Sequence, residues 1–187
     1  MPATTQIMIA RETWWDCYLS GWQDGEITSD AFSHPAKYAK GLIYRIFKVG
    51  IERGWWDKQT TLLDPFAGVG LGGLAAASFG LKWLGVELEQ RFCRIANGYD
   101  CPGYTHSAGD KLRPGCCQTC QKDWSSPPHR YVGNFDLYRS RWDTLGLPHP
   151  QIIQGDSRRL AEIVREAGGA VTSPPWNHSH VNDFQSD

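Results

Sequence analysis

The sequence has no long apolar run, no excess of charge of one sign and no leader-like N-terminus. Lys and Arg number 19 against 20 Asp and Glu, a net charge of −1, which excludes a polycationic coat protein and an acidic disordered tail. The longest uncharged run, residues 65–81, contains five glycines and falls short of the ~20 apolar residues that span a bilayer. The first residues, MPATTQIMIARE, lack a basic segment followed by an apolar one. We therefore expect a cytoplasmic protein with no membrane partner.

The composition is otherwise that of an ordinary folded chain. Its 187 residues are 41% hydrophobic and include 20 Gly, 9 Trp and 6 Cys. This length is typical of one domain, or at most two small ones, and suffices to bury a core. Because no secretory leader is visible, we expect the cysteines to be reduced thiols or metal ligands and not a disulfide framework.

The hydrophobic pattern changes along the chain from helical to alternating strand and helix. Helices are predicted over residues 9–22, 35–54, 71–79, 89–98 and 157–168, and strands over 60–66, 82–88, 151–155 and 170–173. The alternation favours an α/β fold with a Rossmann-like, doubly wound and mainly parallel sheet. We expect an N-terminal helical segment (1–30), a core (31–98 and 150–187) and an insertion (99–149) too long for a plain connection.

A glycine-rich turn follows the first predicted strand. Asp64 ends that strand, and the glycines Gly68, Gly70 and Gly73 allow a ligand to approach the backbone at the carboxyl edge of the sheet. Glu87 ends the next strand, where an acidic residue can bind ribose hydroxyls. The pattern by itself allows NAD or another adenosine cofactor.

Two further positions follow later strands. Asp156 can accept a hydrogen bond from an adenine amino group, or it can cap the helix that begins after it. The run SPPW follows the last predicted strand. The Ser173 side chain and the Pro174 carbonyl can accept hydrogen bonds from an exocyclic amine, while Trp176 stacks on the attached ring. Such a clamp is suited to a base that has been flipped out of its helix.

Five segments together resemble the S-adenosylmethionine-dependent amino-methyltransferases of DNA: AFSHPAKYAKGLI (31–43), DPFAGVG (64–70), GVELEQ (85–90), QGDS (154–157) and TSPPW (172–176). The resemblance implies the methyltransferase type of Rossmann-like fold and favours S-adenosylmethionine over NAD. It implies that the cofactor is bound by His34, Lys37, Asp64, Phe66, Ala67, Gly68, Gly70, Glu87, Leu88 and Asp156. It also implies that catalysis is carried by Ser173, Pro174, Pro175 and Trp176.

The activity implied is site-specific DNA methylation, of the kind found in restriction-modification, on the exocyclic amine of a flipped base. Within the resembled family SPPW is more often found in cytosine-N4 enzymes, so cytosine N4 is favoured over adenine N6. The alternatives are a non-catalytic fragment that binds cofactor or nucleic acid and needs a partner chain, and a methyltransferase that acts on RNA or protein.

Two features depart from the resembled family. Its sheet continues beyond the catalytic motif, whereas this chain ends soon after it. We therefore expect a sheet that is incomplete at the C-terminus and is completed by a second chain or a missing C-terminal segment.

The second departure is the cysteine-containing insertion. It contains Cys101, Cys116, Cys117 and Cys120, and the last two have the spacing of zinc ligands. A structural zinc ion bound by these four cysteines is one expectation, and free thiols in a loop are the other.

Overall fold

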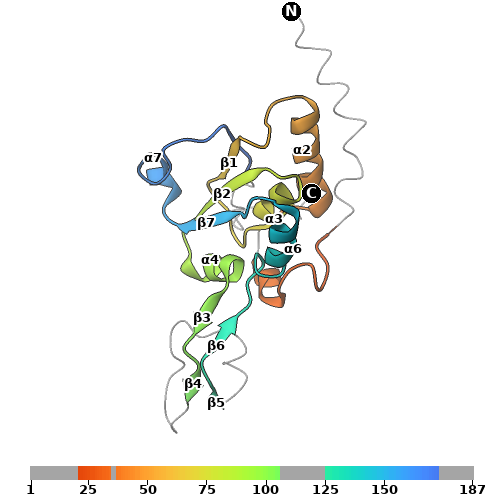
Figure 1. Cartoon of the computed structure of the whole chain (residues 1–187). Helices are drawn as coiled ribbons and strands as arrows, with labels where there is room; N and C mark the ends of the chain where they lie inside the picture. Colours follow the sequence, from red (N-terminus) through yellow and green to blue (C-terminus); the bar gives the residue numbers. More distant parts are fainter. Residues whose placement is uncertain (1–20, 35–36, 106–124, 173–187) are drawn as a thin grey trace, which may run out of the picture.

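The computed structural model describes residues 21–34, 37–105 and 125–172. Its centre is a four-stranded sheet in the order β7-β2-β1-β8, in which every neighbouring pair is parallel (Figure 1). β1 is the first strand of this sheet; β2 and β7 are added on one side of it, and β8 is added later on the other side. This is the doubly wound α/β arrangement that the alternating pattern predicted. The strands are β1 (Thr61–Asp64), β2 (Lys82–Glu87), β7 (Gln151–Gln154) and β8 (Gly169–Ala170).

Helix α3 (Leu71–Ser78) is enclosed by the rest of the fold. Its residues 71–77 are all buried, and it contacts both β2 and α2 (Lys40–Glu52). A helix that is apolar all round must be covered on every side. The small side chains of its sequence, LGGLAAAS, let the sheet and α2 approach closely; a Cβ built on Gly73 would lie 2.8 Å from Trp83.

Helix α2 buries one face against the core. Ile43, Phe47 and Gly50 lie on it and are buried, at the helical spacing of four and three residues. Gly50 has no room for a side chain, because a built Cβ would lie 2.0 Å from the ring of Trp56. The helix begins at Lys40, after the predicted start at residue 35.

Two short antiparallel pairs form an arm that projects from the sheet (Figure 1). The arm consists of β3 (Tyr99–Cys101) with β6 (His129–Tyr131), and β4 (Tyr104–Thr105) with β5 (Ser125–Ser126). It follows α4 (Gln90–Asn97), which contacts β2 and β7. From Tyr131, the last residue of β6, the chain runs through residues 131–138, called here the return segment, into α6 (Arg139–Leu145). Phe135 and Trp142 are buried in the core, although both belong to the predicted insertion.

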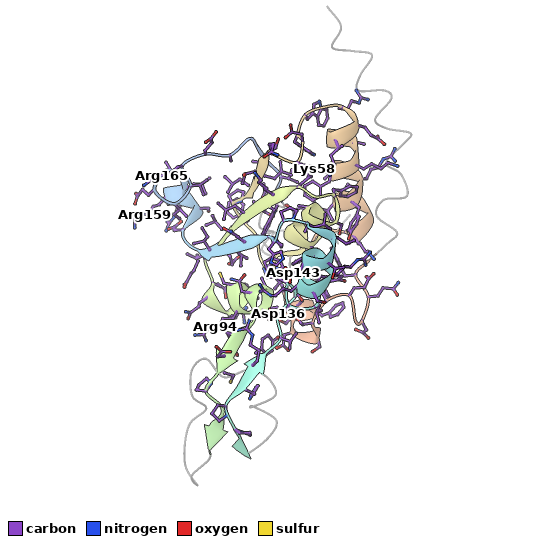
Figure 2. The ribbon with its side chains drawn as sticks, viewed as in Figure 1. Lys58, Arg94, Asp136, Asp143, Arg159 and Arg165 are labelled. Carbon is purple, nitrogen blue, oxygen red and sulfur yellow. The ribbon has the colours of Figure 1, made fainter. Side chains whose placement is uncertain are left out.

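The predictions were less accurate at the ends of the chain. The predicted helix 157–168 is only a 3-10 turn, η2 (Ser157–Arg159), followed by α7 (Leu160–Ile163). Neither has a buried residue, and a helix with no packed face is not stabilised beyond a turn or two. Figure 2 shows Arg159 and Arg165 at this end of the molecule.

The predicted strand 170–173 is limited to Gly169–Ala170 in the described residues. The predicted helix 9–22 lies outside the described residues except for its last two, which are not helical. A further 3-10 turn, η1 (Ser29–Ser33), precedes α2. None of the helices in the described residues is long and apolar enough to cross a membrane.

Candidate cofactor and methyl-transfer site

The candidate site lies at the carboxyl edge of the parallel sheet. Asp64 ends β1 and Glu87 ends β2, and the parallel pairing brings both ends to this edge. Thr172 follows β8 and Asp156 follows β7 at the same edge. β1 and β8 meet where the direction of winding reverses, which is where open α/β sheets bind their ligands.

Residues 65–70, called here the glycine loop, are held by backbone hydrogen bonds to β2. The amide of Ala67 donates to the Val86 carbonyl at 3.0 Å, and the amide of Gly68 donates to Glu87 Oε2 at 2.8 Å. Gly68 and Gly70 have φ angles of +54° and +79°, a left-handed conformation that glycine adopts without strain. The backbone conformation is therefore by itself a sufficient reason for glycine at these two positions.

Asp64 is fully buried and connects three segments. Its Oδ1 accepts a hydrogen bond from the Phe66 amide at 3.1 Å, and its Oδ2 accepts one from the Tyr38 hydroxyl at 3.2 Å. Thr172 donates a further side-chain hydrogen bond. Burial raises the pKa of Asp64 to about 6 against the opposing effect of these bonds, and the charge of Glu87 raises it further. The end of β8 is thus attached to the end of β1.

The carboxylate of Glu87 is oriented by the backbone around it. Its Oε2 accepts from Gly68, and its Oε1 accepts from the amide of Glu89 at 2.8 Å. Two large apolar side chains are exposed nearby. Leu88, which follows Glu87 in the sequence, is 63% exposed, and Phe66 in the glycine loop is 41% exposed. Exposed apolar groups beside an oriented carboxylate are suited to a ligand with both a ring and hydroxyl groups.

The segment before α2 lies over the glycine loop. A Cβ built on Gly68 would lie 2.9 Å from His34 Cε1, so the imidazole packs directly on that glycine. The ring also packs edge-on against Phe92, with centroids 4.2 Å apart. Lys37 Nζ donates to the carbonyls of Phe32 and His34, and burial lowers the pKa of Lys37. The structure thus brings His34, Glu87 and the glycine loop together.

Asp156 acts as a cap in this structure. Its Oδ1 accepts from the Arg158 amide at 3.0 Å, and its Oδ2 lies 2.5 Å from Arg158 Nη2. The hydrogen bond and charge of the guanidinium lower the pKa of Asp156 to about 2. The capping alternative is therefore present in the structure, and the adenine contact stays a prediction.

Several predicted residues lie outside the described residues: Ser173, Pro174, Pro175, Trp176, Cys116, Cys117 and Cys120. Cys101 is described; it is buried in β3 and lies opposite His129 of β6. Within the described part of the chain, no group of three or more His, Cys, Asp or Glu side chains is placed to hold a metal ion. The structure thus gives the zinc prediction no support.

Sequence reasoning missed three residues that shape this edge. Tyr38 and Thr172 both reach Asp64, and they lie inside two of the quoted segments, so only their partner was unforeseen. Asn134 reaches the glycine loop from the predicted insertion, 65 residues away along the chain. No local pattern in the sequence signals a contact of that separation.

Comparison with known families points to DNA methylases. The family model N6_N4_Mtase, described as DNA methylase, matches residues 8–98. Over these residues the chain is similar to this DNA methylase family. The match includes the glycine loop, His34 and Glu87, and it ends before Asp156 and Ser173. S-adenosylmethionine is the cofactor expected for this family, so the match favours it over NAD. No curated relative matches the chain.

The raised pKa of Asp64 predicts a pH dependence of the protein's stability. The pKa is about 6 in the folded chain against the ordinary value of 3.8, so the folded state binds the proton more tightly, and stability falls as the pH rises through this window. Relative to Asp64→Asn, the wild type should lose about 2.5 kcal/mol of unfolding free energy between pH 4 and pH 7. Urea unfolding of both proteins across this range measures the difference; parallel pH profiles would contradict it.

Proposed function

We propose that this chain is a DNA amino-methyltransferase that transfers the methyl group of S-adenosylmethionine to the exocyclic amine of a flipped base, with cytosine N4 preferred over adenine N6. The observation that carries the proposal is the contact between Thr172 and Asp64. Ser173 follows Thr172 directly in the sequence, which supports a position of the SPPW segment at the carboxyl edge where the glycine loop starts.

The cofactor contacts follow from the chemistry at this edge. Asp64, Gly68 and Gly70 are assigned to the methionine end, together with Lys37 and with His34, which packs on Gly68. The Glu87 carboxylate provides acceptors for the ribose hydroxyls. The exposed side chains of Phe66 and Leu88 provide apolar surface for the adenine ring; Ala67 and Asp156 complete the set. When bound, S-adenosylmethionine supplies a methyl group on a sulfonium, which leaves as a neutral thioether.

The proposed clamp acts on the base and not on the cofactor. The Ser173 side chain and the Pro174 carbonyl each accept a hydrogen bond from the exocyclic amine. These two bonds withdraw the nitrogen lone pair from conjugation with the ring. Pro175 keeps the turn rigid, and Trp176 stacks on the flipped ring. The lone pair forms the new N–C bond as the C–S bond breaks, and the resulting ammonium loses its proton to water. Since the sulfonium is a good leaving group, orientation supplies most of the catalysis.

The free edge of β8 is a place where additional strands could join the sheet. β8 pairs with β1 on one side, and no strand of the described residues pairs with its other side. An unpaired edge next to a proposed active site is a place for strand addition. We propose that a C-terminal segment or a second chain completes the sheet there; without it the chain would be a cofactor-binding module.

The ribose assignment predicts a specific loss of affinity. Glu87→Ala should weaken S-adenosylmethionine binding by about 3 kcal/mol, because it removes charge-assisted hydrogen bonds. Glu89→Ala is the matched control: it keeps the backbone amide that orients Glu87 and should leave the affinity unchanged within about threefold. Titration calorimetry measures both. Equal losses in the two variants would remove Glu87 from the site.

The clamp assignment predicts how two variants divide binding from turnover. Trp176→Ala should weaken capture of the duplex by about 1–3 kcal/mol and leave cofactor affinity nearly unchanged. Ser173→Ala should lower the transfer rate more than the DNA affinity, because its hydrogen bond strengthens as the nitrogen becomes tetrahedral. Methyl transfer to duplexes with cytosine or adenine at the target site also tests the base preference. Full turnover of Ser173→Ala on every duplex, or transfer only to RNA or protein, would refute the assignment.

The zinc prediction has its own test. The predicted ligands are Cys101, Cys116, Cys117 and Cys120, and the last two have the spacing of zinc ligands. If a structural zinc ion is bound there, elemental analysis of protein purified without added metal should find about one zinc per chain. The double variant Cys117→Ser with Cys120→Ser should abolish it. A metal-free protein with titratable thiols would identify the cysteines as ordinary loop residues.

A further inference from the structure

Asn134, in the return segment after the arm, is fully buried and bonded on both sides of its side chain. Its Nδ2 donates to the Val69 carbonyl of the glycine loop at 2.8 Å. Its Oδ1 accepts from the Thr28 amide at 2.8 Å and from Thr28 Oγ1 at 3.0 Å. Because a backbone amide only donates and a carbonyl only accepts, these partners determine the orientation of the side-chain amide.

The backbone beside Asn134 is attached to the end of α4. The amide of Asn134 donates to the Ile95 carbonyl at 2.8 Å, and the amide of Phe135 donates to the Ala96 carbonyl at 2.9 Å. The Phe135 ring closes the glycine loop from the same side: a Cβ built on Gly70 would lie 2.6 Å from Phe135 Cζ. The glycine loop thus has two supports, β2 on one side and residues 134–135 on the other.

The return segment also holds the chain that places His34. The Tyr131 hydroxyl donates to Asp30 Oδ2 at 2.7 Å, and the Tyr138 hydroxyl donates to the Glu26 carbonyl at 2.9 Å. The turn between them is stabilised by Asp136, which is labelled in Figure 2 and accepts from the Gly133 amide at 3.1 Å. One segment therefore contacts both the glycine loop and the stretch leading to His34.

We propose that Asn134 is a positioning residue that sets the glycine loop for the cofactor. The Val69 carbonyl lies in a buried part of the loop, where a carbonyl with no donor is unfavourable. Without the Asn134 donor the loop would shift to find another partner and would carry Gly68 and Gly70 with it. The positioning of the loop by Asn134 follows from these contacts, and its effect on cofactor binding rests on the proposed function.

Asn134→Asp is the sharpest test, because it keeps an acceptor for Thr28 and replaces the donor to Val69 with a second acceptor. Asn134→Ser is a neutral variant in case the buried carboxylate prevents folding; its hydroxyl is too short to reach both partners. Thr28→Val is the matched control, since it removes one hydrogen bond to Asn134 but keeps the backbone one and the bond to Val69.

Hydrogen exchange of the full chain without cofactor gives the first measurement. Amides of residues 68–71 should exchange about tenfold faster in both Asn134 variants and within about twofold of wild type in Thr28→Val. Amides in α2 should be unaffected in all three. Unchanged exchange in the loop, or equal acceleration in α2, would refute a local positioning role.

Calorimetric titration with S-adenosylmethionine gives the second measurement. The Kd should rise about tenfold in the Asn134 variants and stay near the wild-type value in Thr28→Val. A wild-type chain that does not bind S-adenosylmethionine, but whose loop exchange responds as described, would refute the proposed function and leave the positioning role standing. Normal cofactor affinity in the Asn134 variants would refute the positioning role while the proposed function stands.

Discussion

The buried carboxylate of Asp64 is the constraint on which the rest of the site depends. Burying a charge is costly unless hydrogen bonds compensate for it. Here the compensation comes from Phe66, Tyr38 and Thr172, so the same bonds that make the burial tolerable also attach three separate segments to the end of β1. The carboxylate thereby joins the glycine loop, the segment before α2 and the end of β8.

Close approach of backbones is the second physical requirement. Helix α3 lies between the sheet and α2 because its side chains are small. The glycine loop lies against His34 on one side and Phe135 on the other, at distances that leave no room for a Cβ at Gly68 or Gly70. The glycines therefore serve the packing of the protein as well as the approach of a ligand. A glycine pattern alone does not distinguish these two uses, and the similarity of residues 8–98 to the DNA methylase family favours a ligand-binding use.

Most of the sheet and the helices around it were predictable, for reasons visible in particular residues. Leu62 and Leu63 form a short buried run ending in Asp64, and Ile43 and Phe47 recur at helical spacing. The prediction failed where packing was missing: residues 164–168 have a helical pattern, but no side chain of α7 is buried, and the helix ends at Ile163. In the predicted insertion, the aromatic residues Phe135 and Trp142 lie in the core, which no local sequence pattern indicated.

The sequence by itself determined the class of fold, the order of the motifs and the identity of the groups at the carboxyl edge, because strand and helix periodicity and glycine turns are local properties. The tertiary structure alone decided which groups meet. The amide of Gly68 orients the Glu87 carboxylate, Thr172 reaches Asp64, and Asn134 reaches the Val69 carbonyl. These contacts join residues far apart in the chain, and they form because each buried donor or acceptor needs a partner that only the folded chain brings near.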